Sequence, residues 1–141
     1  MNLQRINLAA LVLLLGFHAF YQASFFTQLA MNPGQILESN GISADLALNL
    51  AGLLTLVSAG QALLVVLSLL AIAWTLGGNR AGAVTGSVVG AYFLGIGIAL
   101  YFSRDGVLDQ YVIVDIARGA LTLLLAGIDW SIRLGQKSPN D

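Results

Sequence analysis

The sequence has no cysteine and only one histidine, and these two shortages exclude several kinds of site. Without cysteine there is no disulfide, no thiolate metal ligand and no cysteine nucleophile, while the redox compartment stays open. A single histidine, His18, cannot form a histidine-cluster metal site within one chain. We therefore expect no metal site and no cofactor.

Charged residues are also scarce, at 9% of the 141 residues, whereas hydrophobic residues make up 57%. A soluble domain is about 25% charged, and a chain this poor in charge could not cover its surface with polar groups in water. Six Lys+Arg and seven Asp+Glu give a net charge of −1, so there is no basic face for nucleic acid. Lipid is the expected solvent, and the lipid bilayer is the first expected partner.

Several catalytic and transport motifs are missing from the sequence as well. It contains no glycine-rich phosphate loop, no serine nucleophile elbow and no HExxH pair. It contains neither a TVGYG filter nor an arginine repeat like that of a voltage sensor. The function must therefore be sought in isolated polar residues within apolar segments.

What the sequence does contain is four apolar stretches, each long enough to cross about 30 Å of hydrocarbon as a helix. In lipid every backbone polar group must be satisfied internally, so we expect α-helices. The stretches cover residues 6–29, 46–76, 81–102 and 111–134. The sequence predicts an all-α membrane protein, a four-helix transmembrane bundle that forms a single domain over residues 1–141.

The segments between the stretches carry turn signals. Residues 32–34, Asn-Pro-Gly, end the first stretch, because proline lacks the N–H that a helix needs. Ser43 can cap the second helix, with Asp45 in its first turn. Residues 77–79 and 103–106 form short links, so the last three helices are expected to be antiparallel neighbours. The first stretch is expected to stay uncleaved, since Tyr21 lies where a signal-peptide cleavage site needs a small residue.

The basic residues near the helix ends predict the orientation. If both termini are cytoplasmic, one side holds four basic residues and the other holds only Arg104. The four are Arg5, Arg80, Arg133 and Lys137. We expect both termini in the cytoplasm and a bacterial cytoplasmic (inner) membrane as the location. Four short glycine-containing spans also resemble the DoxX-like small bacterial membrane proteins in span number and size, and this resemblance assigns no residue a role.

Glycines of the third stretch recur at four-residue spacing, at Gly82, Gly86 and Gly90. Such a small-residue face lets a neighbouring backbone approach closely, and packing drives helix association in lipid. The face can serve packing within the chain, or it can form a homo-oligomer. Both alternatives stay open at this point.

The fourth stretch contains an acid and a base three residues apart, Asp115 and Arg118. This spacing lets the side chains meet on one helix face. Counted from a start near Leu108, Arg118 lies about 15 Å into the helix. An arginine at this depth costs about 2.5–3.5 kcal/mol to insert, so it should face protein or a cavity. The pair can tie helices together, it can form a site for an anion, a lipid headgroup or a proton, or Arg118 can extend its side chain to the outer interface.

Other polar residues fall at a similar depth when residues are counted along each stretch. We expect His18, Gln61, Tyr92 and the Asp115–Arg118 pair to share one layer of the bundle. A lone histidine in a span usually forms a hydrogen bond between helices, although it can also relay protons. If the layer lines a pocket, its entrance would be formed by Gln22, Ser24 and Asn49.

The leading hypothesis for function is a non-enzymatic membrane protein, either an accessory subunit of a larger membrane complex or a binder of a small or lipidic ligand. Its expected ligand-binding residues are Arg118, Asp115, His18, Gln22, Gln61 and Tyr92. One alternative is a small transporter or channel that acts as an oligomer. The other is a membrane enzyme that uses His18 as an acid or base.

Overall fold

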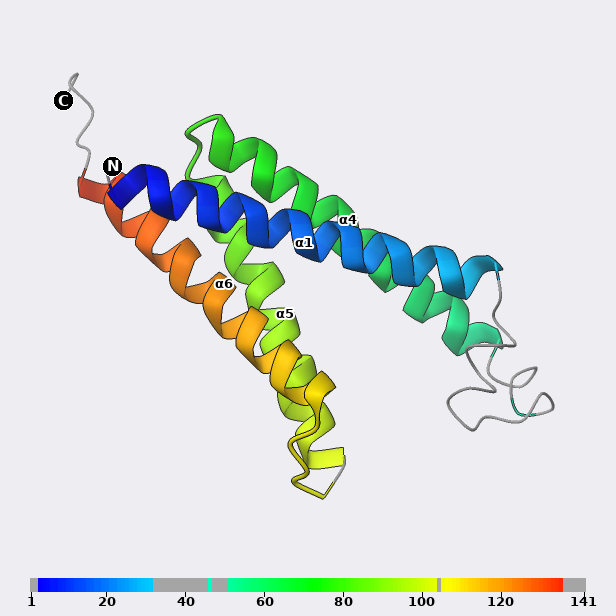
Figure 1. Ribbon diagram of the computed structural model, residues 1–141. Helices are drawn as coiled ribbons and strands as arrows, with labels where there is room; N and C mark the ends of the chain where they lie inside the picture. Colours follow the sequence, from blue (N-terminus) through cyan, green and yellow to red (C-terminus); the bar gives the residue numbers. More distant parts are fainter. Residues whose placement is uncertain (1–2, 32–45, 47–50, 104, 136–141) are drawn as a thin grey trace. The chain divides into compact units, whose positions relative to one another are not determined.

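The computed structural model of the chain describes residues 3–31, 46, 51–103 and 105–135 (Figure 1). The described residues form four α-helices and no strand: α1 Leu3–Met31, α4 Ala51–Leu76, α5 Ala81–Ser103 and α6 Gln110–Gly135. Each contains a segment long and apolar enough to cross a membrane. The expected all-helical class with four candidate spans is confirmed, and these spans indicate an integral membrane protein.

The helix ends agree with the predicted spans to within a few residues where they are described. The second stretch was expected to begin at residue 46; α4 is described from Ala51, and residues 47–50 lie outside the described residues. The predicted turn at residues 32–34 and the predicted cap at Ser43 and Asp45 lie outside the described residues.

The link between α4 and α5 is a tight glycine turn. Gly78 has a left-handed φ of 74°, the Asn79 N–H donates to the Trp74 carbonyl at 2.8 Å, and the Gly78 N–H donates to the Thr75 carbonyl at 3.2 Å. These two bonds form a Schellman motif, in which glycine adopts the left-handed conformation without steric cost. Asn79 then caps the next helix, because its Oδ1 accepts the Ala81 N–H at 2.9 Å. The sequence predicted both the position and the shortness of this link.

The link between α5 and α6 likewise has a left-handed residue after the first helix and a capping residue before the second. Asp105 has a left-handed φ of 53°, and the Gly106 N–H donates to the Tyr101 carbonyl at 3.0 Å. Asp109 Oδ1 accepts the backbone N–H groups of Tyr111 and Val112, both at 2.9 Å. Its negative charge at the N-terminus of α6 is also favourable for the helix dipole.

The chain divides into two compact units, and α1 and α4 contribute to both. The first unit contains Met1–Phe17 and Leu67–Asp141, and the second contains His18–Val66. The first unit therefore includes parts of all four helices. Its buried apolar core is made of Leu11, Leu15, Ala71, Val89, Phe93 and Ala126.

Within the first unit, α5 and α6 run side by side with their backbones in contact (Figure 1). Glycine makes this approach possible. A Cβ atom on Gly119 would lie 2.8 Å from the Gly90 carbonyl oxygen, and one on Gly97 would lie 2.8 Å from the Ile116 nitrogen. Any larger residue at these positions would meet backbone, which cannot move aside as a flexible side chain can.

The expected glycine face is buried inside the first unit. A Cβ on Gly82 would lie 2.8 Å from the Thr75 Cα, and one on Gly90 would lie 3.0 Å from the Leu123 nitrogen. Gly86 faces Ala126 and leucines of α1 at ordinary contact distance. The structure therefore uses these glycines for packing within the chain. A second copy could reach them only if α5 separated from its neighbours, so a homo-oligomer through this face stays an untested prediction.

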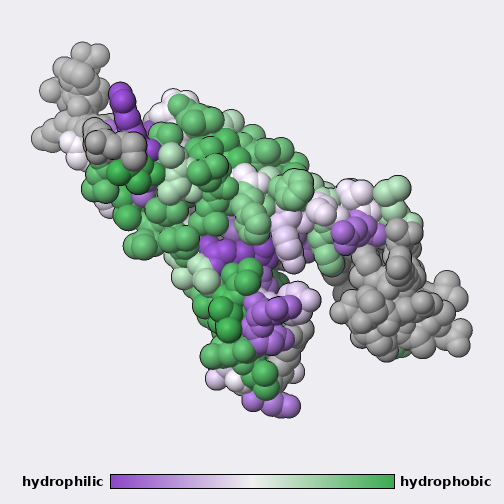
Figure 2. Space-filling model, viewed as in Figure 1, coloured by the Kyte–Doolittle hydropathy of each residue, from purple (hydrophilic) through white to green (hydrophobic). Residues whose placement is uncertain are grey.

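Large apolar side chains cover the outside of the helices. Leu13, Phe102 and Leu124 are examples, with 73%, 73% and 60% of their surface exposed. Figure 2 shows apolar residues over much of the visible surface of the described helices. Exposure of this extent would be costly in water, whereas in a bilayer these side chains meet acyl chains.

Candidate functional site

Arg118 lies within the membrane-crossing part of α6. The helix has 26 residues, and Arg118 is the ninth of them. At 1.5 Å per residue it lies about 12 Å from the start of the helix and roughly 7 Å short of its middle. Because α6 begins at Gln110 rather than near Leu108, this depth is smaller than the expected 15 Å, but it still lies within a hydrocarbon layer of about 30 Å.

The Arg118 side chain contacts an acid on its own helix and an aromatic ring on α5. Its Nη2 forms an ion pair with Asp115 Oδ1, and the two side chains are 8% and 14% exposed. Its Cζ lies 3.9 Å from the centre of the Phe93 ring on α5. The predicted meeting of Asp115 and Arg118 is confirmed. Through Phe93, a residue that the sequence interpretation missed, the pair also connects α6 to α5.

This geometry decides what Arg118 can do chemically. A cation over the face of a ring gains about 0.5–2 kcal/mol, with the larger values where water is excluded. Asp115 offsets the arginine charge, so the pair presents no net positive charge to an anion. Removing one partner of a buried pair is costly because the other charge is left uncompensated. The arrangement therefore supports helix packing more directly than it supports anion binding.

Tyr92 on α5 is more exposed than its neighbour Phe93. Its side chain is 38% exposed, and its ring meets the neighbouring Phe93 ring edge to face at 5.5 Å. Successive residues of a helix point about 100° apart, so one position separates the exposed ring from the ring under Arg118. Tyr92 therefore stays an untested member of the expected ligand-binding set, with an exposed ring beside the buried ring of Phe93.

The remaining members of the expected layer belong to the second unit. His18 on α1 is buried, and Gln61 on α4 is half-buried. Gln22, an expected entrance residue one turn from His18, is also buried. The Asp115–Arg118 pair belongs to the first unit, so the single shared layer stays a prediction. Of the expected entrance residues, Ser24 is half-buried and Asn49 lies outside the described residues.

A second ionic cluster occupies the last turns of α6. Arg133 Nε donates to Asp129 Oδ2 at 2.7 Å, as the four-residue spacing predicts, and Arg133 Nη2 donates to the Thr75 carbonyl of α4 at 3.0 Å. Arg80 Nη2 donates in turn to the Arg133 carbonyl at 3.3 Å. A cation at the C-terminus of α4 gives the Thr75 carbonyl a second donor beside the Gly78 N–H and is favourable for the helix dipole. The cluster therefore joins α4, the turn that follows it, and α6.

Asn7 forms another contact between helices that was not predicted. Its Nδ2 donates to the Leu125 carbonyl of α6 at 3.1 Å, and the side chain is buried. The only signal for it in the sequence is a polar amide inside an apolar stretch, which in lipid favours a partner on another helix. This bond places the start of α1 beside the second half of α6 in the first unit.

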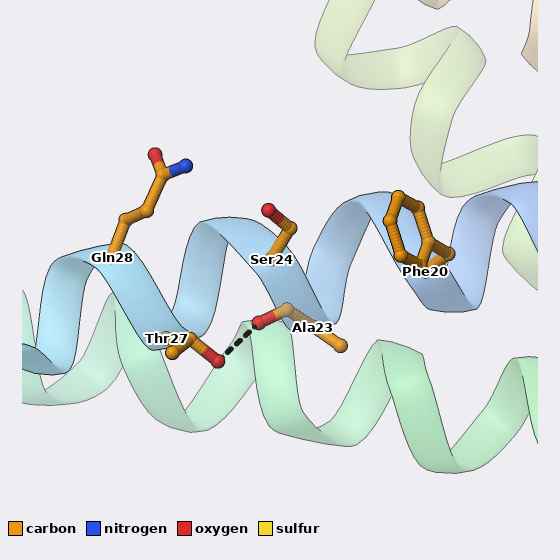
Figure 3. A pocket seen from close by; sticks show the side chains of 5 residues that line it. All are labelled: Phe20, Ala23, Ser24, Thr27 and Gln28. Atoms are coloured by element: carbon orange, nitrogen blue, oxygen red, sulfur yellow. Dashed lines mark hydrogen bonds between the residues drawn. The ribbon is translucent and has the colours of Figure 1, made fainter.

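An open hollow, here called the α1 hollow, lies along α1 in the second unit. It has a volume of about 350 Å³ and is lined by Phe20, Ala23, Ser24, Thr27 and Gln28. Figure 3 shows that all five side chains come from one helix, with Thr27 bonded to the carbonyl of Ala23. That bond, from Thr27 Oγ1, is 2.8 Å long. Gln28 is exposed, and its side chain makes no hydrogen bond within the described residues.

Comparison with known proteins adds no relative. No family model matches the sequence, and neither a curated protein nor a solved structure matches it. The likeness to DoxX-like proteins therefore stays one of span number and size. No role is transferred to any residue, and the function must be argued from the side chains described above.

Proposed function

We propose that this protein is an accessory subunit of a membrane complex, a non-enzymatic four-helix protein that packs a partner's membrane helix against the α1 hollow. The observation that carries the proposal is the exposed Gln28 amide, which has no partner within the described residues and borders a face of small side chains. A polar side chain at the edge of the hydrocarbon gains from a hydrogen bond to another helix.

The residues of the α1 hollow suit helix packing. Ala23 and Thr27 are small residues at four-residue spacing, which lets a second helix approach closely. Ser24 and Gln28 lie on the same face and can bond to that helix. Phe20 supplies an apolar contact at one end. The Asp115–Arg118 pair then serves the protein internally, by holding α5 and α6 together.

Chemical crosslinking in native membranes tests the proposal. A photoreactive amino acid at position 24 should give one reproducible crosslinked protein, whereas the same group at the exposed position 13 should not. Filling the hollow with Ala23→Leu and Thr27→Leu should abolish a complex seen by native mass spectrometry. The control Leu13→Phe should leave it intact. Complexes that survive the filled hollow would contradict the proposal.

A small or lipidic ligand is the second candidate occupant, and the volume of the hollow favours it. About 350 Å³ falls within the range of ligand pockets. An acyl chain could lie against Phe20 while its polar end meets Gln28. Crosslinking at position 24 to a lipid, with no crosslinked protein, would favour this candidate.

The orientation and location are proposed on charge alone. Both termini are placed in the cytoplasm of a bacterial cell, with Arg5, Arg80 and Arg133 at the inner surface of its cytoplasmic membrane. The native chain has no thiol, so engineered cysteines can be labelled without background. Asn79→Cys should be protected from an impermeant reagent in intact cells and Gln35→Cys should react. The reverse pattern would overturn the orientation.

An oligomeric transporter or channel, and an enzyme that uses His18, remain the alternatives from the sequence. Native mass spectrometry of the purified chain separates them from the accessory subunit, since a strict monomer counts against a channel. Replacement of His18 by Gln removes the titratable imidazole, so loss of the complex in this variant would show that His18 serves assembly.

A further inference from the structure

We propose that the turn between α4 and α5 binds the phosphate group of an anionic phospholipid, through the guanidinium groups of Arg80 and Arg133. This site is separate from the α1 hollow and does not depend on the function proposed above. All of its residues belong to the first unit.

The first observation concerns an unused donor on Arg133. Its Nε and Nη2 are bonded to Asp129 and to the Thr75 carbonyl, whereas its Nη1 has no hydrogen-bond acceptor among the described residues. The residue is only 8% exposed. A Cβ atom on Gly78 would lie 3.6 Å from this Nη1, so the donor points at the glycine turn. This Nη1 is not one of the buried polar atoms of the described residues, so it is open at the surface of the turn, where the acceptor of a ligand can reach it.

The second observation is the position of Arg80 in the same turn. Arg80 is exposed, and only its Nη2 makes a hydrogen bond, a long one of 3.3 Å to the Arg133 carbonyl. Its remaining donors make no hydrogen bond with a described residue. Two guanidinium groups with free donors at one turn match the several oxygens of a phosphate.

The charge of the cluster favours an anion, in contrast to the Asp115–Arg118 pair. Arg80 and Arg133 carry two positive charges against the single negative charge of Asp129, which leaves one in excess. The backbone contributes little, because Asn79 already accepts the Ala81 and Gly82 N–H groups of α5. Binding would therefore depend on the arginine side chains.

A phospholipid is the favoured source of the phosphate because of where the turn lies. It directly joins two helices that can each cross a membrane, so it lies at the level of the lipid headgroups. Basic pockets between membrane helices bind anionic headgroups elsewhere, and each surface arginine attracts anionic lipid. The side-chain-free Gly77 and Gly78 leave the turn open to a headgroup.

Native mass spectrometry in a neutral detergent can test the site by titration with short-chain phosphatidylglycerol and phosphatidylcholine. We expect one phosphatidylglycerol to bind in preference to phosphatidylcholine. Arg80→Gln should weaken this binding about 10-fold or more, as loss of a charged hydrogen bond does. The matched control is Arg5→Gln, which removes an exposed arginine of the same unit and should weaken binding less than about 2-fold.

Two further measurements, one with the Arg80→Lys variant and one with inorganic phosphate, test the chemistry of the site. Lysine keeps the charge without the planar fork, so it should recover only part of the affinity. If inorganic phosphate alone raises the melting temperature, and Arg80→Gln abolishes the rise, the site stands with a free anion as its ligand. Equal losses in Arg80→Gln and Arg5→Gln, or equal binding of the two lipids, would overturn the proposal.

Discussion

Helix α6 carries two acid–base pairs that differ in depth, partners and charge balance. Asp115 and Arg118 lie within the hydrocarbon, balance each other and meet the Phe93 ring of α5. Asp129 and Arg133 lie in the last turns of the helix, where Arg133 also bonds to the Thr75 carbonyl. The first pair packs against an aromatic ring, whereas the second bonds to the backbone of α4 and has Arg133 Nη1 open at the turn.

This difference shows how the same chemistry can serve two purposes in one helix. In the hydrocarbon no water solvates an uncompensated charge, so the partners of the inner pair must come from the protein itself. Near the membrane surface, water and headgroups can complete a partly satisfied arginine. Depth therefore separates a pair that packs helices from one that can also bind a ligand.

Breaking the inner pair should have the largest effect. Arg118→Met leaves Asp115 buried without a partner and should lower the free energy of unfolding by about 3–5 kcal/mol. Thermal or denaturant unfolding in detergent measures the loss. Arg5→Met, at an exposed position, should change stability by less than about 0.5 kcal/mol. Equal effects of both variants would show that Arg118 is solvated.

Adding a side chain at the contact between α5 and α6 should have the next largest effect on stability. Gly119→Ala adds a Cβ against the backbone of Leu94 and Gly90, which should cost near the upper end of about 1–3 kcal/mol. Gly127→Ala, on the same helix with nothing within 4 Å, should be neutral or stabilise by up to about 1 kcal/mol. Similar losses at both positions would mean that α6 does not contact α5 as described.

Weakening the outer pair should cost less than breaking the inner one. Arg133→Met leaves the buried Asp129 carboxylate without its partner, and we expect a loss of about 3 kcal/mol, the lower end for a broken buried pair, because the last turns of α6 lie nearest to water. Unfolding in detergent with and without phosphatidylglycerol should also show that this variant gains less from the lipid than the native chain. A loss larger than that of Arg118→Met would reverse the order of the two pairs.

Replacing the Phe93 ring should have the smallest effect on the free energy of unfolding. Phe93→Leu keeps an apolar side chain beside Arg118 and loses the ring face, at a cost of about 0.5–2 kcal/mol. Phe102→Leu is the matched control, since Phe102 is exposed on the same helix. If both changes are silent, the ring contributes no cation–π energy.

Much of the fold was predictable because the position and length of a membrane helix depend mainly on the residues of its own segment. Apolar length fixed the four spans, and Gly78 and residues 103–106 marked the turns. The two ion pairs followed from three- and four-residue spacing on one helix. Each of these inferences needs only neighbours along the chain.

The contacts between helices were not predictable in the same way. Phe93 rather than Tyr92 meets Arg118, and Asn7 finds a carbonyl more than a hundred residues away. Depth can be counted from a helix end, but the rotation of a helix about its axis depends on packing with its neighbours. The sequence therefore indicated which polar groups need partners and not which partners they find.

A double-mutant cycle on Arg118 and Asp115 measures most directly whether the inner pair serves packing within the chain. Arg118→Met and Asp115→Leu should each lower the free energy of unfolding, by about 3–5 kcal/mol for the arginine. The double variant should lie far closer to the native chain than the sum of the two losses, because two uncharged side chains leave nothing uncompensated. Additive losses would contradict an internal pair and would show that each residue has a separate partner.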